Sequence, residues 1–225
     1  MEVLREQLIQ RNNNTYTFLD DVSGNIVVSK DFITFDGAGF TLNASGYSLQ
    51  TGIDLTSRKN VTVKNLVIID YDVGIFCGSG TTNITISGNY IHNCGNGIEF
   101  LGASNNTIKY NTFKDNSIDV SIEYVLGNNL ITQNSVDSYI QVWMSDQQTI
   151  DMNYWTDYNG TDNDGDGIGD TPYYYHETLM DYHPLIDPIP VIPEFPSWTL
   201  LIAGFLAVTV FSIIFRRNFK QGRKI

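Results

Sequence analysis

Basic residues are scarce in most of this sequence. Before Trp198 there are eight Lys and Arg residues against all 25 Asp and Glu residues, a net charge of −17. So acidic a surface disfavours binding to nucleic acid phosphates, and we expect no nucleic acid partner. It suits divalent cations or a high-salt exterior, and solubility alone would also account for it.

Cysteine, histidine and methionine are scarce as well. Cys77 and Cys94 are 17 residues apart, out of step with a repeat of about 23, so we expect two buried thiols; a disulfide is the alternative. Copper would require a Met, His or Cys cluster. The sequence scatters these residues instead, so copper handling is a lesser alternative; they are His92, His176, His183, Met144, Met152 and Met180.

A short phrase recurs five times: a β-branched residue followed five positions later by another apolar one. The pairs are Val63 and Ile68, Ile86 and Ile91, Ile108 and Phe113, Ile131 and Val136, and Ile150 and Trp155. The leading residues are 23, 22, 23 and 19 positions apart. A fixed period in this range indicates a solenoid, which presents a long wall rather than one preformed pocket.

A second strand signal lies about ten residues before each leading position. It is marked by Gly52-Ile53, Gly74-Ile75, Gly97-Ile98, Val120 or Ile122, and Ile140. Two or three short strands per turn predict an all-β parallel β-helix with inward side chains in ladders. A leucine-rich repeat has a similar period, but its Leu-x-x-Leu-x-Leu pattern is missing.

An Asn follows the leading residue by three places in the last four copies, at Asn89, Asn111, Asn134 and Asn153. We interpret these as structural corner residues with left-handed backbone angles. Their amides are expected to hydrogen-bond along a ladder from turn to turn.

Upstream, residues 25–28 and 32–35 are expected to form less regular turns, and residues 2–11 a short amphipathic helical cap.

The longest uncharged run is Trp198–Phe215, 18 residues that as a helix would span roughly 27 Å, close to a bilayer core. Five basic residues follow within 216–225, which predicts a cytoplasmic tail and an extracellular body at the cell membrane. Pro193-Glu194-Phe195-Pro196 before this run resembles the archaeal PEF-type sorting signal. That resemblance implies removal of the helix by an archaeosortase; a permanent membrane anchor is the alternative.

No secretory signal peptide is visible at the start of this sequence, because Met1 opens directly onto Glu2, Arg5 and Glu6 without an apolar region. For an outward-facing body we therefore expect a truncated or mis-started reading frame, or insertion directed by the C-terminal helix.

Residues 162–170 carry the sharpest chemical signal. Carboxylates at positions one, three, five and nine, with Gly at six, match the start of a calcium loop. Ca²⁺ would take side-chain oxygens of Asp162, Asp164 and Asp166, the carbonyl of Ile168, and Asp170 directly or through water. Position twelve is Tyr173 rather than Glu, and helical flanks are missing, which excludes an EF-hand.

The terminal block resembles NosD-type right-handed β-helix proteins. The resemblance lies in residues 153–158, the acidic loop, Thr171-Pro172-Tyr173 and residues 181–185, and it covers about residues 15–187. It implies a right-handed coil; some relatives serve copper delivery, and the wider group includes carbohydrate-binding and sugar-cleaving proteins.

The sequence therefore predicts a membrane-anchored cell-surface β-helix that binds glycans or envelope proteins and is stabilised by calcium. A polysaccharide lyase or glycoside hydrolase is the alternative, with Asp54, Glu99, Asp119 and Glu123 lining a groove, although no acid/base pair is recognisable. Aromatic residues 173–175, Trp143 and Trp155 could stack on sugars, but packing under the acidic loop is the favoured use.

The expected parts are a cap or start (1–14), β-helix (15–155), calcium-loop segment (156–187), proline stalk (188–197), transmembrane helix (198–215) and basic tail (216–225).

Overall fold

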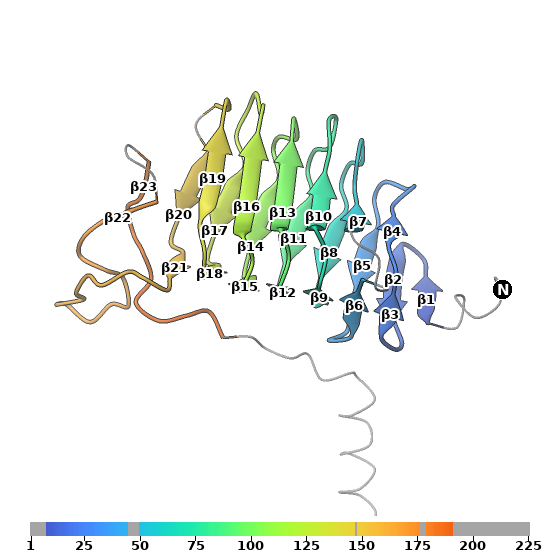
Figure 1. The fold of residues 1–225 in the computed structure, drawn as a ribbon, viewed down its shortest axis with the longest axis horizontal. Helices are drawn as coiled ribbons and strands as arrows, with labels where there is room; N and C mark the ends of the chain where they lie inside the picture. Colours follow the sequence, from blue (N-terminus) through green and yellow to red (C-terminus); the bar gives the residue numbers. More distant parts are fainter. Residues whose placement is uncertain (1–7, 45–49, 147, 176–178, 191–225) are drawn as a thin grey trace, which may run out of the picture. The chain divides into compact units, whose positions relative to one another are not determined.

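The fold consists of three β-sheets that wind into one coil (Figure 1). The structure, a computed structural model, describes residues 8–44, 50–146, 148–175 and 179–190. By its contacts the chain divides into two units, Met1–Ile192 and Pro193–Ile225, and all described residues belong to the first.

The chain visits the three sheets in turn, adding one short strand to each per turn. The eight-stranded sheet contains β1 (Ile9–Asn12), β2 (Thr15–Phe18), β5 (Thr34–Asp36), β8 (Thr62–Lys64), β11 (Thr85–Ser87), β14 (Thr107–Lys109), β17 (Leu130–Thr132) and β20 (Thr149–Asp151). The seven-stranded sheet contains β3 (Val22–Ser23), β6 (Thr41–Asn43), β9 (Val67–Ile69), β12 (Tyr90–His92), β15 (Thr112–Lys114), β18 (Ser135–Val136) and β21 (Tyr154–Trp155). The six-stranded sheet contains β4 (Ile26–Val27), β7 (Thr51–Asp54), β10 (Val73–Cys77), β13 (Asn96–Leu101), β16 (Ile118–Glu123) and β19 (Ile140–Trp143).

Neighbouring strands in these sheets are parallel, except β1 and β2. A separate antiparallel hairpin of β22 (Tyr173–Tyr174) and β23 (Met180–Asp181) lies beyond the last turn. The predicted all-β parallel β-helix, of about six turns, is therefore confirmed. Among the described residues no helix is long and apolar enough to cross a membrane, and the helix predicted at 198–215 lies outside them.

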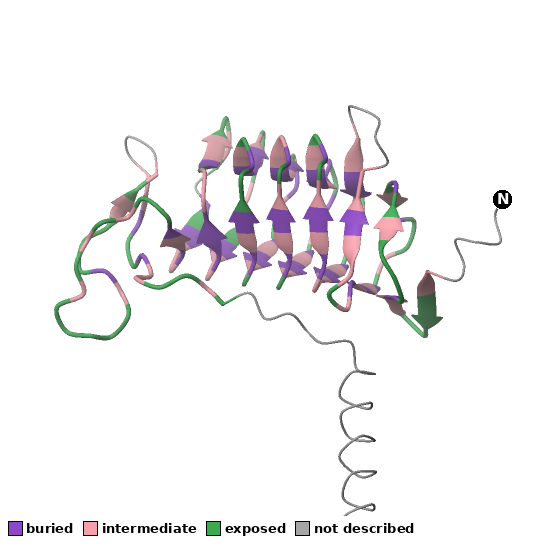
Figure 2. Ribbon diagram, turned by 60° about the horizontal axis from the view of Figure 1, so that its bottom comes forward, coloured by how far each residue is buried: buried purple, intermediate pink, exposed green. Residues whose placement is uncertain are grey.

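The recurring apolar pairs build the core. In each copy the first member lies on the eight-stranded sheet and the second on the seven-stranded sheet, and all ten side chains are at most 4 % exposed. These side chains are stacked in register from turn to turn; for example, Ile86 lies between Val63 and Ile108 on the neighbouring strands. Figure 2 shows the same alternation, with a buried residue recurring at the middle of strand after strand. The repeat period thus fixes which residues face inward.

The Asn ladder is also present. The Nδ2 atom of Asn89 donates to Asn111 Oδ1, Asn111 to Asn134, and Asn134 to Asn153, each at 3.0 Å. The expectation of left-handed angles at these residues is wrong. The preceding residue has the positive φ instead, at Gly88, Tyr110, Gln133 and Met152. The turn is made one residue earlier, which leaves each Asn free to point inward and bond two neighbouring turns.

The N-terminal prediction needs correction. Residues 9–12 form strand β1, which pairs with β2 from Ile9 opposite Phe18 to Asn12 opposite Thr15, so they are not part of a helix. The connecting residues are Asn13, whose φ is 53°, and Asn14; Asn tolerates this angle in a tight turn. Residues 2–7 of the expected cap lie outside the described residues.

Cys77 and Cys94 are free thiols, and both are buried. Burial raises the pKa of Cys94 to about 11 and raises that of Cys77 further, so both stay protonated at neutral pH. The expectation of two separate buried thiols is therefore confirmed.

Candidate functional site

The acidic loop brings together three of the five predicted calcium ligands. Carboxylate oxygens of Asp162, Asp164 and Asp166 lie within 4.8 Å of one another. Asp162 also holds the loop in shape, because it accepts hydrogen bonds from the main-chain nitrogens of Gly165 at 2.7 Å and Gly167 at 2.9 Å. The bond from Gly167 is the main cause that lowers the pKa of Asp162. These carboxylates form a small, oxygen-only cluster in which Asp162 is half-buried and Asp164 and Asp166 are exposed.

The other two predicted ligands lie differently. Asp170 accepts a 2.9 Å hydrogen bond from the Asn163 main chain, and a second one from the Asn163 side chain. Ile168 is half-buried and forms an antiparallel bridge with Leu185, which in turn bridges to Tyr154 of the last turn. Ile168 therefore ties the loop to the end of the coil.

Aromatic residues pack beneath this loop. The ring of Trp155 stacks on Tyr173 at 4.4 Å and on Tyr175 at 5.5 Å, and Trp155 is 1 % exposed. The hydroxyl of Tyr158 donates to the Thr171 carbonyl at 2.7 Å. Packing, the favoured interpretation of these aromatic residues, is therefore confirmed for Trp155, Tyr173 and Tyr175. It is wrong for Tyr174 and Trp143, whose side chains are exposed.

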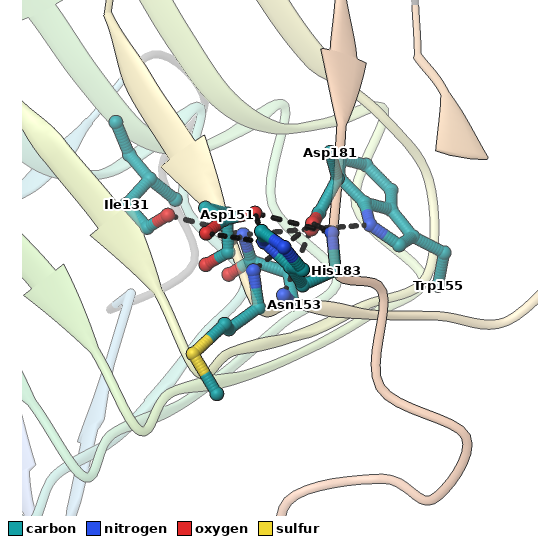
Figure 3. Close-up of polar contacts among 7 residues, drawn as sticks. Ile131, Asp151, Asn153, Trp155, Asp181 and His183 are labelled. Carbon is teal, nitrogen blue, oxygen red and sulfur yellow. Dashed lines mark hydrogen bonds and ion pairs between the residues drawn. The ribbon is translucent and has the colours of Figure 1, made fainter. Parts of the chain in front are cut away.

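Asp181, fully buried at the end of the coil, was not singled out from the sequence as a functional residue (Figure 3). Its carboxylate accepts main-chain hydrogen bonds from Met152, Asn153 and His183 at 2.8 to 3.1 Å. It also accepts the indole N–H of Trp155 at 3.0 Å. Burial raises the pKa of Asp181 despite these donors. Asp181 thus occupies the place that the next Asn would take and closes the ladder.

Of the five described His and Met candidates for copper, His183, Met152 and Met180 lie at the end of the coil, and the other two lie elsewhere. His183 Nδ1 lies 3.0 Å from both oxygens of Asp151 at the coil end, whereas the ring of His92 lies against Tyr90 on β12. Met152 and Met180 lie near the coil end, Met144 is exposed after β19, and His176 lies outside the described residues. Among the described residues, Asp162, Asp164 and Asp166 form the only group of three or more His, Cys, Asp or Glu side chains that lie close enough together to hold a metal ion.

The outer face of the six-stranded sheet receives three of the four acids proposed for a groove. Asp54, Glu99 and Glu123 are partly exposed on β7, β13 and β16. Asp119 does not join them, because its side chain is fully buried and accepts hydrogen bonds from the Asp137 and Ser138 main chains at 2.8 Å. Including Asp119 in the groove was therefore wrong. Its carboxylate instead holds the main chain at Asp137 and Ser138, just before β19.

One end of this face carries exposed aromatic rings. Trp143 is 46 % exposed and Tyr124 is 50 % exposed, and their rings meet edge to face with centroids 5.0 Å apart. Glu123 lies directly opposite Trp143 on the neighbouring strand. Ser121 fixes Glu123 through a 3.1 Å hydrogen bond to Oε1. We call Tyr124, Trp143 and Glu123 the aromatic corner.

From the sequence, Trp143 was only one of several aromatic residues considered for stacking on sugars. Its exposure could have been inferred by counting strand alternation from Ile140, which faces inward. Tyr124 directly follows β16 and has a φ of 53°, so alternation along the strand would not have located it.

These observations define a parallel β-helix protein closed by a terminal hairpin. Residues 10–174 match the model of a family described as periplasmic copper-binding protein (NosD). The match covers well over half of the chain, so the chain belongs to the NosD family. Comparison with curated proteins and with solved structures gives no match.

Proposed function

We propose that this NosD-family chain acts outside the cytoplasm and binds glycans of the cell envelope at the aromatic corner. The periplasmic description of the family supports the location. The exposure of Trp143 and Tyr124 next to a fixed carboxylate carries the glycan assignment. Large aromatic side chains left in water mark binding surfaces, and ligand sites combine such rings with a few placed polar groups.

A binding experiment on the full chain tests this assignment. Neutral and charged oligosaccharides are titrated against the wild type, Trp143→Ala and Tyr110→Ala. Tyr110 is the matched control, since it is 45 % exposed and follows β14 of the eight-stranded sheet. We expect Trp143→Ala to weaken binding at least about tenfold, the effect of losing a central aromatic contact. Binding that survives Trp143→Ala unchanged contradicts the assignment.

A polysaccharide lyase or glycoside hydrolase on the same face is the second candidate. Glu123 lies two positions beyond Ser121, the residue opposite Glu99 on the next strand. Strand spacing and rise then separate the two Cα atoms by about 8 Å. Glu side chains on Cα atoms this far apart can bring two carboxyl groups within the separation used by paired acid catalysis. Release of reducing ends that stops in both Glu99→Gln and Glu123→Gln would support an enzyme; turnover indifferent to both would exclude this pair.

We also propose that Ca²⁺ binds the acidic loop. Hard oxygen ligands suit calcium, and a cation would relieve the repulsion among Asp162, Asp164 and Asp166. Ile168 and Asp170 remain proposed ligands, through the Ile168 carbonyl and either a direct or a water-mediated contact to Asp170. The ion would lock the terminal segment onto the coil.

Copper handling, the lesser alternative, agrees with the description of the family. Copper favours imidazole, thiolate and thioether ligands. Both thiols are buried and protonated, and the two described histidines lie on different parts of the coil. The single acidic cluster offers only carboxylate oxygen. Among the described residues, His183, Met152 and Met180 share the coil end, and copper handling stays the lesser alternative.

The body is proposed to be attached to the cell membrane through residues 198–215, with 216–225 in the cytoplasm. The uncharged run and the basic residues after it support this topology. Processing at the archaeal PEF-type signal is the alternative. The intact mass of the mature protein decides between them: a mass that includes residues 198–225 excludes removal of the helix.

A further inference from the structure

The outer face of the six-stranded sheet has acidic residues and no basic ones. Its strands contribute Asp54, Glu99 and Glu123 to this face, and none of the six strands contains Lys or Arg. The described Lys and Arg residues all lie elsewhere, at Arg11, Lys30, Arg58, Lys59, Lys64, Lys109 and Lys114. Within the strands of this sheet the acids are therefore not interspersed with basic residues.

The three acids also differ in their partners from the salt-bridged acids on the other faces. Asp36 on the eight-stranded sheet pairs with Lys64 at 2.9 Å, and Asp137 pairs with Lys114 at 3.0 Å. By contrast, Asp54 accepts from Thr56, Glu99 from Asn96 and Glu123 from Ser121, all neutral donors. Among the described residues, none of these three carboxylates has a cationic partner within salt-bridge distance. Neutral donors fix the carboxylates in place and leave their charge uncompensated.

Their fields reinforce one another. Asp54 and Glu99 both lie opposite Phe76, on the strands to either side of it. Two strand spacings therefore separate their Cα atoms by about 10 Å. Glu99 and Glu123 are separated by about 8 Å, so each pair is close to one Debye length in physiological salt. The face therefore repels anionic sugars and attracts cationic ones.

The aromatic corner adds a second preference of the same sign. A cation over the face of an exposed Trp or Tyr ring is attracted by the negative face of the ring. Trp143 and Tyr124 can thus contact both the apolar face of a sugar ring and an ammonium group on it. A neutral sugar would use only the first of these contacts.

We propose that this face binds polymers of amino sugars with free, protonated amino groups, in preference to acetylated or acidic polysaccharides. This inference rests on the proposed glycan function and specifies its ligand class. Glu99 and Glu123 recognise the ammonium groups, and Trp143 supports the sugar ring.

Calorimetric titration of the full chain tests the ligand class with three oligosaccharides of equal length. They are β-1,4-linked glucosamine, β-1,4-linked N-acetylglucosamine and α-1,4-linked galacturonate, compared above the ordinary pKa of glutamate, about 4.3, and with the amines protonated. We expect glucosamine to bind about tenfold more tightly than N-acetylglucosamine, from one exposed ion pair and one cation–π contact. Galacturonate should bind most weakly.

The double variant Glu99→Gln/Glu123→Gln should abolish the preference for glucosamine. Asp70→Asn/Asp115→Asn is the control with the same change in net charge; both residues are exposed and have positive φ, which Asn tolerates. It should keep the preference. Equal affinity for the two amino sugars, or a preference that survives the glutamate changes, overturns this inference and leaves glycan binding intact. Failure of the wild type to bind any of the three overturns both.

Discussion

The indole nitrogen of Trp155 donates a 3.0 Å hydrogen bond to the carboxylate of Asp181, which joins the last strand of the coil to the terminal hairpin. The same carboxylate accepts the main-chain N–H of Asn153, the last member of the Asn ladder, at 2.8 Å. A coil of stacked turns must end somewhere, and its final turn presents donors that lack a following turn. One buried acid from a distant segment satisfies several of these donors at once.

Replacing Asp181 by Ala should strongly destabilise the protein. The change leaves buried donors of Asn153 and Trp155 without their acceptor, and each unsatisfied group costs about 1–3 kcal/mol. We expect a loss of about 3 kcal/mol in the free energy of unfolding, measured by urea denaturation. Asp187→Ala is the control, since Asp187 is exposed and only six residues away. Equal stability of the two variants would show that Asp181 does not close the coil.

Removing an interior member of the ladder should be costly for a related reason. Asn111 Nδ2 donates to the carbonyls of Ile86 and Lys109, and Asn111 Oδ1 accepts from Asn89. Asn111→Ala is therefore expected to lower the free energy of unfolding by about 3 kcal/mol. The control is Asn128→Ala, whose side chain makes only exposed hydrogen bonds with Thr149 and should cost less than about 1 kcal/mol. Similar losses in both variants would mean that the ladder contributes no special stability.

Most of the coil could be predicted because its signals are local and repeated. Each apolar pair reports one turn, and the 19-residue final spacing correctly marks the shorter last turn. A second ladder was missed, in which Asn106 Nδ2 donates to Asn129 and Asn129 Nδ2 donates to Gln148. Its signal was present two residues before Ile108, Ile131 and Ile150, but the final Gln breaks the Asn pattern.

The residues that could not be predicted depend on contacts outside the repeat. Asp119 stands opposite Gly97 in the register and next to the inward-facing Val120. Strand alternation therefore predicts an outward, exposed acid at this position rather than a buried one. Asp181 meets Asn153 across 28 residues, and a period of about 23 does not indicate that contact. The three clustered aspartates of the acidic loop were expected because the motif is compact, whereas the pairing of Asp170 with Asn163 was not.

Calcium should stabilise the protein through the acidic loop. At a concentration one hundred times its Kd, an ion that binds only the folded state adds about 2.7 kcal/mol and raises Tm. Asp164→Asn is the sharpest variant, because Asp164 makes only one long 3.3 Å hydrogen bond within the loop, whereas Asp162 shapes it. We expect the variant to keep its Tm in chelator and to lose most of the calcium-dependent rise.

The matched control for this experiment is Asp146→Asn, an exposed acid outside the loop. It should retain the full calcium response. A wild-type Tm that is the same in calcium and in chelator would contradict the proposed site, as would an undiminished rise in Asp164→Asn.

The buried Asp119 should make stability depend on pH in a direction opposite to that of a salt-bridged acid. Burial is the main cause that raises the pKa of Asp119 above its ordinary value of 3.8, and hydrogen bonds from Ser138, Asn116 and Asp137 oppose it only in part. Between 3.8 and the raised folded pKa, the folded state binds more protons than the unfolded state. The contribution of Asp119 is therefore fully present below 3.8 and is lost as pH rises through the folded pKa.

Comparison with Asp119→Asn isolates this contribution, because Asn does not titrate and its oxygen can still accept from the Asp137 and Ser138 main chains. Acids that do not contact Asp119, including Asp181, titrate alike in both proteins and cancel in the difference. Urea denaturation across the acidic range should show the stability of the wild type, relative to the variant, falling as pH rises and then levelling off. A difference that is independent of pH, or one that grows with pH, would contradict a raised pKa for Asp119. The direction follows because a carboxylate without a cation is costly to bury even when three donors reach it.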